Sequence, residues 1–155
     1  MPLFIGFIPT PPEYVDGFFE LAQLSPSDIV YDLGSGDGRL LFAALEKGAG
    51  HVVGVELNHE LVRTAKETAK SKGVEDRATF IEADVMEVNL AKATLILCYL
   101  YPSASEALKP KFESELKPGT RVIMETFGIP GWKPVRTFDK GSRQFYLYTL
   151  PTETT

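Results

Sequence analysis

The sequence has little cysteine and little histidine. Cys98 is the only cysteine among 155 residues, so the chain can form neither an internal disulfide nor a site built from several thiolates. Because the residues around Cys98 are apolar, we expect it to be a small buried core residue. His51 and His59 lie eight positions apart without a matching carboxylate pattern, and we predict no metal site.

The sequence also lacks a long hydrophobic run. Its longest apolar stretch is far shorter than the roughly 20 residues that a helix needs to cross a bilayer. Residues 1–10 contain no Lys or Arg and no small-residue cleavage pattern typical of a secretory leader. We therefore expect a cytoplasmic protein that does not associate with membranes.

An excess of basic residues is missing as well. Sixteen Lys and Arg stand against 21 Asp and Glu, which gives a formal net charge of -5. Proteins that bind nucleic acid along its backbone rely on clustered Lys and Arg, so bulk nucleic-acid binding is not expected. A chain of 155 residues is the size of one domain, and we predict a single domain over residues 1–155 of unknown oligomeric state.

Helix-like and strand-like segments alternate along most of the chain. A helix is predicted over about 11–24, with Thr10 as its N-cap and Glu13 completing a capping box. Strand-like runs separated by helical stretches then follow at 29–33, 51–57, 78–82, 93–100 and 120–127. The helical stretch before the last of these runs contains Pro110, where we expect an interruption. This alternation is typical of an α/β fold with a mostly parallel sheet.

The end of the chain has a different pattern. Two strand-like runs over about 134–150 are joined by Asp139-Lys140-Gly141-Ser142, which leaves no room for a helix. This spacing predicts a β-hairpin, and therefore an antiparallel strand near the end of the sheet.

A glycine-rich, acidic loop follows the first strand-like run, in the sequence IVYDLGSGDGR. Its alternating glycines, which allow backbone amides to approach a ligand closely, are Gly34, Gly36 and Gly38. A dinucleotide-binding fingerprint requires G-x-G-x-x-G, but Arg39 stands where the last glycine is needed. Asp32 and Asp37 would repel a pyrophosphate. A ligand with cationic groups, such as the sulfonium and ammonium of S-adenosylmethionine, fits this loop better.

Two further acids follow later strand-like runs. Glu56 ends the second run, where a carboxylate can accept hydrogen bonds from both ribose hydroxyls of a nucleoside. Asp84 follows the third run and is suited to the exocyclic amine of an adenine, with Val85 beside the ring. Because ligands of open α/β sheets bind at the carboxyl ends of the strands, we expect Asp32, Glu56 and Asp84 to converge on one rim.

The motifs DLGSGDGR, VVGVELN and EADV resemble the successive motifs of the class I, seven-stranded S-adenosylmethionine-dependent methyltransferases. The resemblance implies a Rossmann-like sheet of order 3-2-1-4-5-7-6, with the last strand antiparallel and helices on both faces. It also implies S-adenosyl-L-methionine as methyl donor, S-adenosyl-L-homocysteine as product, and Leu57 and Asn58 of the second motif beside the donor.

The segments FIPTP, LKPKFESELKPGTRV and GWKP are similar to small protein lysine methyltransferases of archaea and to their mitochondrial relatives. This likeness implies protein substrates with accessible lysines. It also implies that Phe7, Pro9 and Thr10 lie against the donor, and that Tyr99 and Tyr101 line a lysine channel. Methyltransferases acting on a small molecule or RNA, and a non-catalytic nucleoside-binding module, stay open as alternatives.

Methylation of a lysine requires that the amine lose its proton, because a free lysine has a pKa of about 10.4. Burial in an aromatic channel next to a cationic donor would lower that pKa, so no dedicated base is required. Glu125, at the end of the fifth strand-like run, either orients the amine or faces solvent.

Overall fold

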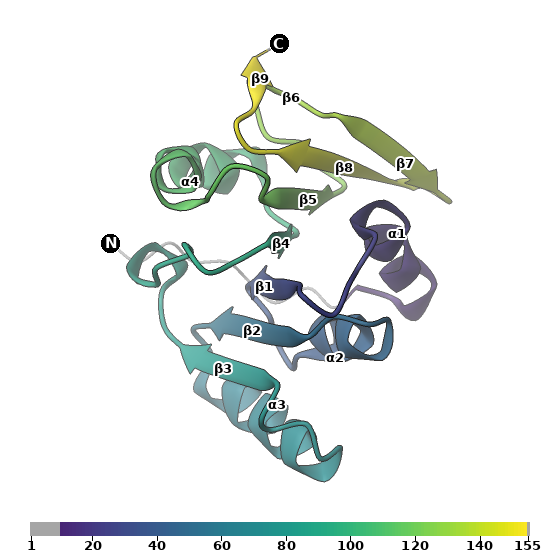
Figure 1. The fold of residues 1–155 in the computed structure, drawn as a ribbon, viewed down its shortest axis with the longest axis vertical. Coiled ribbons are helices and arrows are strands. Elements are labelled where there is room, and N and C mark those ends of the chain that lie inside the picture. Colours follow the sequence, from purple (N-terminus) through teal and green to yellow (C-terminus); the bar gives the residue numbers. More distant parts are fainter. Residues whose placement is uncertain (1–9, 155) are drawn as a thin grey trace.

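A mixed β-sheet forms the middle layer of the molecule, and helices cover both of its faces (Figure 1). The computed structural model describes residues 10–154. The helices are α1 (Pro12–Ala22), α2 (Arg39–Glu46), α3 (His59–Ser71), α4 (Pro102–Glu115) and the short 3₁₀ helix η1 (Val85–Glu87). The strands of the sheet are β1 (Ile29–Leu33), β2 (His51–Glu56), β3 (Ala78–Glu82), β4 (Leu95–Cys98), β5 (Arg121–Glu125), β7 (Arg136–Lys140) and β8 (Arg143–Thr149).

The strand order is β3-β2-β1-β4-β5-β8-β7. The pairs among the first five strands are parallel, whereas β8 is antiparallel to both β5 and β7. The short strands β6 (Trp132–Lys133) and β9 (Glu153–Thr154) form a separate two-stranded sheet. When only the strands of the large sheet are counted, β7 and β8 are the sixth and seventh, so the predicted order and the antiparallel last strand are confirmed.

Two hydrophobic layers hold the helices to the sheet. On one face, apolar side chains of α1, α2 and α3 pack against the strands, among them Phe18, Leu41 and Ala65. On the other face, Leu108 and Phe112 of α4 are fully buried. The prediction of helices on both faces is therefore confirmed (Figure 1).

The structure differs from the sequence-based prediction at two helices. α1 begins at Pro12 with Pro11 as N-cap, and no side chain caps it, so the capping box at Thr10 was wrong. α4 runs through Pro110 without a break, contrary to the expected interruption. An internal proline costs about 3 kcal/mol, but full burial of Leu108 and Phe112 on either side of it holds the helix in place.

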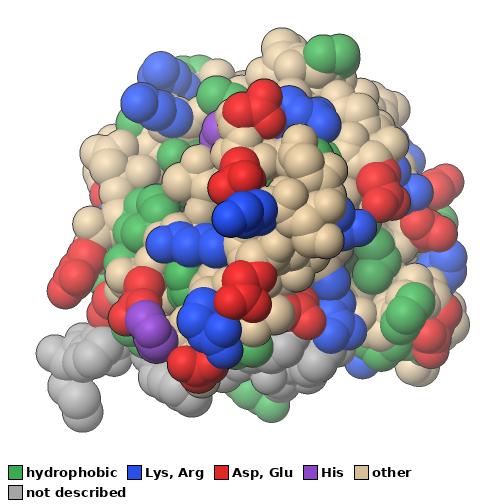
Figure 2. Space-filling view, turned by 90° about the horizontal axis from the view of Figure 1, so that it is seen from below, with side chains coloured by type: hydrophobic (Ala, Val, Ile, Leu, Met, Phe, Trp, Pro, Cys, Tyr) green, Lys and Arg blue, Asp and Glu red, His purple; other side chains and the backbone are tan. Residues whose placement is uncertain are grey.

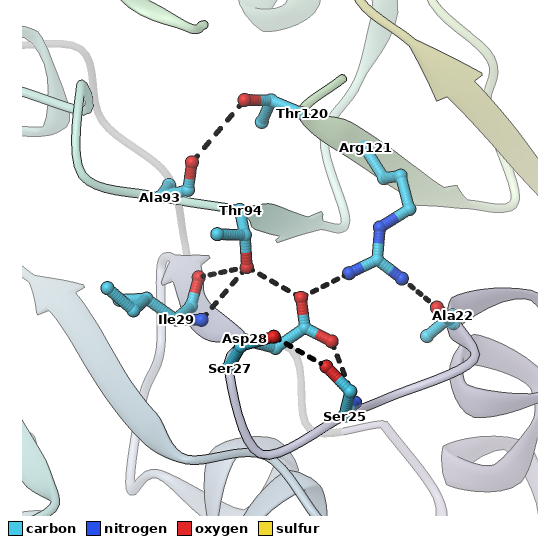
Figure 3. Close-up of polar contacts among 9 residues, drawn as sticks. All are labelled: Ala22, Ser25, Ser27, Asp28, Ile29, Ala93, Thr94, Thr120 and Arg121. Atoms are coloured by element: carbon cyan, nitrogen blue, oxygen red, sulfur yellow. Dashed lines mark hydrogen bonds and ion pairs between the residues drawn. The ribbon is translucent and has the colours of Figure 1, made fainter. Parts of the chain in front are cut away.

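A polar network ties the elements together at the amino edge of the parallel strands (Figure 3). Asp28, just before β1, accepts hydrogen bonds from the Thr94 hydroxyl at 2.7 Å and the Ser25 amide at 2.9 Å. Arg121, at the start of β5, contacts both Asp28 and the last carbonyl of α1, that of Ala22. Because these buried polar groups satisfy one another, we interpret the network as structural.

The surface near α3 carries charges of both signs. Arg63 forms ion pairs with Glu60 and Glu67, and His59 lies 2.6 Å from Glu82. Figure 2 shows acidic and basic side chains interspersed over this end of the molecule, without a basic patch on the described residues of that view. None of the described helices has the length and apolar composition of a membrane span.

Candidate functional site

Polar side chains in or directly after five neighbouring strands, β2, β1, β4, β5 and β8, line one edge of the sheet. In the register, Asp32 of β1 lies beside Gly54 of β2 and Leu97 of β4, and Leu97 lies beside Ile123 of β5. Side chains two residues apart in a strand point to the same face. This alternation directs five polar side chains toward the face covered by α1, namely those of Glu56, Asp32, Tyr99, Glu125 and, on β8, Arg143.

The glycine loop after β1 has a backbone that few other residues adopt. Gly34, Gly36 and Gly38 have φ values of 88°, 57° and 86°, which lie in the left-handed region. The loop passes directly over β2, where a Cβ on Gly54 would lie 2.5 Å from the Ser35 hydroxyl. Gly54 therefore allows the loop to lie close to the sheet, a role that the sequence analysis did not recognise.

The carboxylate of Glu56 organises the loop. It is 4% exposed, and its two oxygens accept hydrogen bonds from the Gly36 amide at 3.0 Å and the Asn58 amide at 2.8 Å. The glycine loop and the start of α3 are thereby held to the end of β2. Since a carboxylate oxygen can accept more than one hydrogen bond, Glu56 keeps capacity for ligand hydroxyls.

The predicted cofactor residues Asn58, Leu57, Asp84 and Val85 differ in their burial and in their hydrogen bonds. Asn58 uses its side-chain oxygen to cap α3 through the Leu61 amide, and Leu57 is 36% exposed. Asp84 is buried and caps η1 by accepting a hydrogen bond from the Met86 amide at 2.9 Å. Val85 is buried beside it.

Asp32 is a buried carboxyl with an unusual ionisation. It is 7% exposed. Burial, followed by the nearby charges of Glu56 and Glu125, raises its pKa to about 8. Near neutral pH this group is therefore largely protonated unless a cation binds next to it.

Glu125 is fully buried at the end of β5, so the alternative that it faces solvent is wrong. Its Oε2 accepts a hydrogen bond from Arg143 at 2.9 Å, within an ion pair. Its Oε1 has no hydrogen-bond partner in the described chain. Burial raises the pKa of Glu125, although the Arg143 guanidinium and a hydrogen bond from the Thr10 side chain oppose the rise. Thr10 is buried and influences this carboxyl, and it does not cap α1.

The backbone directly after Glu125 is strained. Thr126 has a φ of 70°, which is a rare conformation for a β-branched residue. Its amide donates to the Gln144 carbonyl at 2.7 Å. Strained residues of this kind concentrate at functional sites, where the surrounding structure holds them.

Tyr99, Tyr101 and Asp37 differ in their exposure and in their contacts. Tyr99 is half-buried, and Tyr101 is 59% exposed with its ring 5.4 Å from that of Phe127. The Asp37 carboxylate is paired with Arg39 at 2.8 Å, which lowers its pKa. Phe7 and Pro9 lie outside the described residues.

The charge balance of this edge favours a cationic ligand. Among the described residues, the carboxyls of Asp32, Glu56 and Glu125 share a single ion pair, that of Glu125 with Arg143. Buried carboxylates without matching cations are unfavourable. The sulfonium and ammonium of S-adenosylmethionine would supply the missing positive charge, so the residues present fit this molecule. No cluster of ligating side chains suited to a metal ion occurs among residues 10–154.

Arg143 is the residue of this edge that the sequence analysis missed. It precedes Phe145 and Leu147 at alternate positions of β8, and both of these are buried. The sequence did contain a signal for this role, because Arg143 is a charged residue at a position of the strand-like run that alternation directs toward the core.

Comparison with known proteins finds close likenesses over nearly the whole chain. The family described as ANTKMT methyltransferase domain matches residues 32–136. A protein-lysine N-methyltransferase of Saccharolobus islandicus is 43% identical over 94% of both chains. The adenine nucleotide translocase lysine N-methyltransferase of Mus musculus is 32% identical over 88% of this chain, which spans 59% of that protein.

A solved structure is also similar to this chain over nearly its whole length. The crystal structure of an RNA methyltransferase from Salinibacter ruber in complex with S-adenosyl-L-homocysteine has a TM-score of 0.90 and 38% identity. The likeness covers 96% of this chain and 97% of that one.

Proposed function

This chain belongs to the family with the ANTKMT methyltransferase domain, and from that membership we propose that it methylates lysine side chains of proteins with S-adenosylmethionine as donor. The proposal rests on the three buried carboxyls of Asp32, Glu56 and Glu125, of which, among the described residues, only Glu125 forms an ion pair, with Arg143. These carboxyls suit a cationic donor and, beside it, an amine acceptor.

We propose that the residues at the ends of β1, β2 and β3 hold the donor. In this proposal Gly34, Gly36 and Gly38 give the donor access to the loop backbone, and Glu56 accepts from its ribose hydroxyls. Asp84 and Val85 take the adenine, while Asp32 faces the cationic part. The remaining residues proposed to line the donor are Phe7, Pro9, Thr10, Asp37, Leu57 and Asn58.

The acceptor lysine is proposed to enter between Tyr99 and Tyr101, with Glu125 accepting a hydrogen bond from its amine. The described groups must exclude water there, because a solvated lysine stays protonated near neutral pH. When bound, S-adenosylmethionine supplies a methyl group whose bond to sulfur breaks as the nitrogen lone pair forms the new bond. Alignment of the two molecules provides most of the rate enhancement in such a transfer.

The test is transfer of label from methyl-tritiated S-adenosylmethionine to a soluble extract of the source cell. The labelled fraction is divided between protease and nuclease digestion, followed by amino-acid analysis. Label released by protease as methyl-lysine is the expected result. Absence of methyl-lysine in the protease digest would refute the proposal.

Methylation of RNA is the second candidate, because the similar Salinibacter ruber structure is that of an RNA methyltransferase. The net charge of -5 disfavours it. The nuclease digestion of the same experiment decides, since RNA methylation would release labelled nucleosides. The single-domain organisation and the cytoplasmic location stay predictions from the sequence.

A further inference from the structure

Building on the proposed lysine methylation, we propose that Arg143 is a positioning residue of the methyl-transfer site. Its guanidinium holds one oxygen of the buried Glu125 carboxylate, so that the other oxygen is available to the acceptor amine. Arg143 does not contact the reacting atoms in this proposal and acts through Glu125.

The contacts of Arg143 join three separate segments of the site. Its guanidinium carbon lies 4.5 Å from the ring centre of Tyr14 on α1 and 5.8 Å from that of Tyr99 after β4. Its Nη1 lies 2.9 Å from Glu125 Oε2 on β5. A planar guanidinium can stack on aromatic rings and bind a carboxylate at the same time. Arg143 therefore fixes Glu125 relative to a proposed channel residue, Tyr99.

The ion pair is not needed to hold the hairpin to the sheet. β8 pairs with β5 over five successive residues, from Arg121 with Thr149 to Glu125 with Phe145. The Glu125 side chain is 0% exposed and that of Arg143 is 22% exposed. Ion pairs at such depth contribute little net stability because both groups lose their hydration. The pair is better explained by what it does to Glu125.

The pair gives Glu125 two properties that an amine acceptor requires. Its ionised form accepts hydrogen bonds with both oxygens, and Oε1 has no partner among the described residues. The positive charge of Arg143 offsets that of the carboxylate, so the site orients the amine without strongly favouring its protonated form. The other groups that influence Glu125 are the Asp32 carboxyl and the Thr10 side chain, while the Tyr14 and Tyr99 rings lie against Arg143.

The first test is the pH dependence of Arg143→Met, expressed as its rate relative to the unaltered protein. Both rates are initial rates of methyl-lysine formation in the same soluble extract. Without the guanidinium, burial favours the neutral carboxylic acid form of Glu125. We expect about a tenfold loss near pH 7 that diminishes toward pH 9, since one pKa unit changes the ionised fraction about tenfold.

The control variants separate positioning from structure. Arg136→Met removes an exposed arginine of the same hairpin and is expected to leave the relative rate at one throughout. Arg143→Lys keeps the positive charge, so we expect its pH profile to match that of the unaltered protein. Glu125→Gln is expected to lower the rate equally at every pH. A pH-independent loss in Arg143→Met, or the same profile in Arg136→Met, would overturn the proposal.

A direct titration provides a readout that does not depend on activity. Carboxyl ¹³C shifts of labelled glutamates, with Glu125 assigned by Glu125→Gln, report its ionisation with and without Arg143. We expect its pKa to rise by at least about one unit in Arg143→Met, and an unchanged pKa would refute the inference. Arg143→Gln replaces Arg143→Met should the latter not fold.

The two proposals fail in different ways. If the unaltered protein forms no methyl-lysine, the proposed function is wrong, while the ¹³C titration still decides whether Arg143 controls Glu125. If methyl-lysine forms and the Arg143→Met profile equals that of the unaltered protein, the function stands and the positioning role is wrong.

Discussion

The buried carboxyl of Asp32 has a pKa of about 8, far above the ordinary value of 3.8. Its folded-state pKa is raised, so the folded protein binds this proton more tightly than the unfolded chain does. The resulting stability is fully present below about pH 4 and is lost as the pH rises to about 8. Ionised Asp32 therefore destabilises the unliganded fold in the pH range where a cationic donor needs it.

Replacing Asp32 with asparagine is expected to stabilise the unliganded protein. The gain should be about 3–4 kcal/mol larger at pH 8 than at pH 5, because only the aspartate acquires a buried charge over that range. Denaturant unfolding at the two pH values measures it, with the exposed Asp139→Asn as control. An equal gain at both pH values would contradict the assigned pKa.

Asp32→Asn is also expected to weaken the binding of S-adenosylmethionine more than that of S-adenosylhomocysteine, because S-adenosylhomocysteine lacks the sulfonium charge. In the unaltered protein, affinity for S-adenosylmethionine should increase between about pH 6 and 8 as Asp32 loses its proton. Calorimetric titration with both molecules measures this difference. A pH-independent ratio of the two affinities would show that Asp32 does not face the sulfonium.

Glu56 holds the glycine loop through two amides as well as serving as a proposed ribose acceptor. Glu56→Ala is expected to weaken donor binding by about 1.5–3 kcal/mol, the range for hydrogen bonds to a charged group. Equilibrium binding of S-adenosylmethionine measures the loss. Unchanged affinity would mean that neither the loop nor the ribose depends on this carboxylate.

At the scale of elements, α1 packs unusually closely on β8. A Cβ on Gly17 would lie 2.2 Å from Cε2 of Phe145, so Gly17→Ala must move the helix or the ring. Because Tyr14 belongs to this helix and its ring lies 4.5 Å from the Arg143 guanidinium carbon, methyl transfer should fall by about tenfold, which corresponds to about 1.4 kcal/mol. Initial rates at saturating donor measure the effect.

A matched control lies at the opposite edge of the sheet. Thr94→Val removes the hydroxyl that joins Asp28 and the Ile29 amide, and should cost about 1–3 kcal/mol of stability. The amino-edge network does not touch the carboxyl edge, so the rate should be unchanged. If Gly17→Ala and Thr94→Val each lower the rate in proportion to the stability that they lose, the packing of α1 on β8 has no specific role in methyl transfer.

The elements that local patterns control were predictable from the sequence, and the contacts between distant elements were not. Alternating runs and the Asp139–Ser142 turn predicted the parallel strands and the hairpin, because turn chemistry and periodicity act over a few residues. The uninterrupted α4 required knowledge that Leu108 and Phe112 are buried. Likewise, the pairing of Glu125 with Arg143 depends on the strand register, which no local pattern specifies.

The candidate site divides in the same way. The glycine loop, Asp32, Glu56 and Asp84 were recognisable because each lies near the end of a strand-like run or directly after it. Thr10 was predicted both to cap the first helix and to lie against the donor; it does not cap α1, and its side chain is one of the groups that lower the pKa of Glu125. A Thr-Pro-Pro-Glu sequence fits both roles, and only the packing of α1 on the sheet decides between them.

The whole molecule carries a net charge of -5, which affects its association with charged substrates. An acidic enzyme attracts a basic substrate over distances comparable to the Debye length, about 10 Å at 0.1 M salt. Lysines of proteins often occur among other charged groups, so the neighbours of the acceptor lysine should influence the rate of encounter as well as binding.

We therefore predict opposite salt dependences for two peptides with the same central lysine, one flanked by arginines and one by glutamates. Raising the salt concentration from about 50 to about 300 mM should lower kcat/KM several-fold for the basic peptide and raise it for the acidic one, because screening weakens attraction and repulsion alike. Affinity for S-adenosylmethionine, measured in parallel, controls for effects of salt on the donor site. Equal salt dependence for both peptides would mean that recognition depends on the rim of the lysine channel and not on the field of the whole protein.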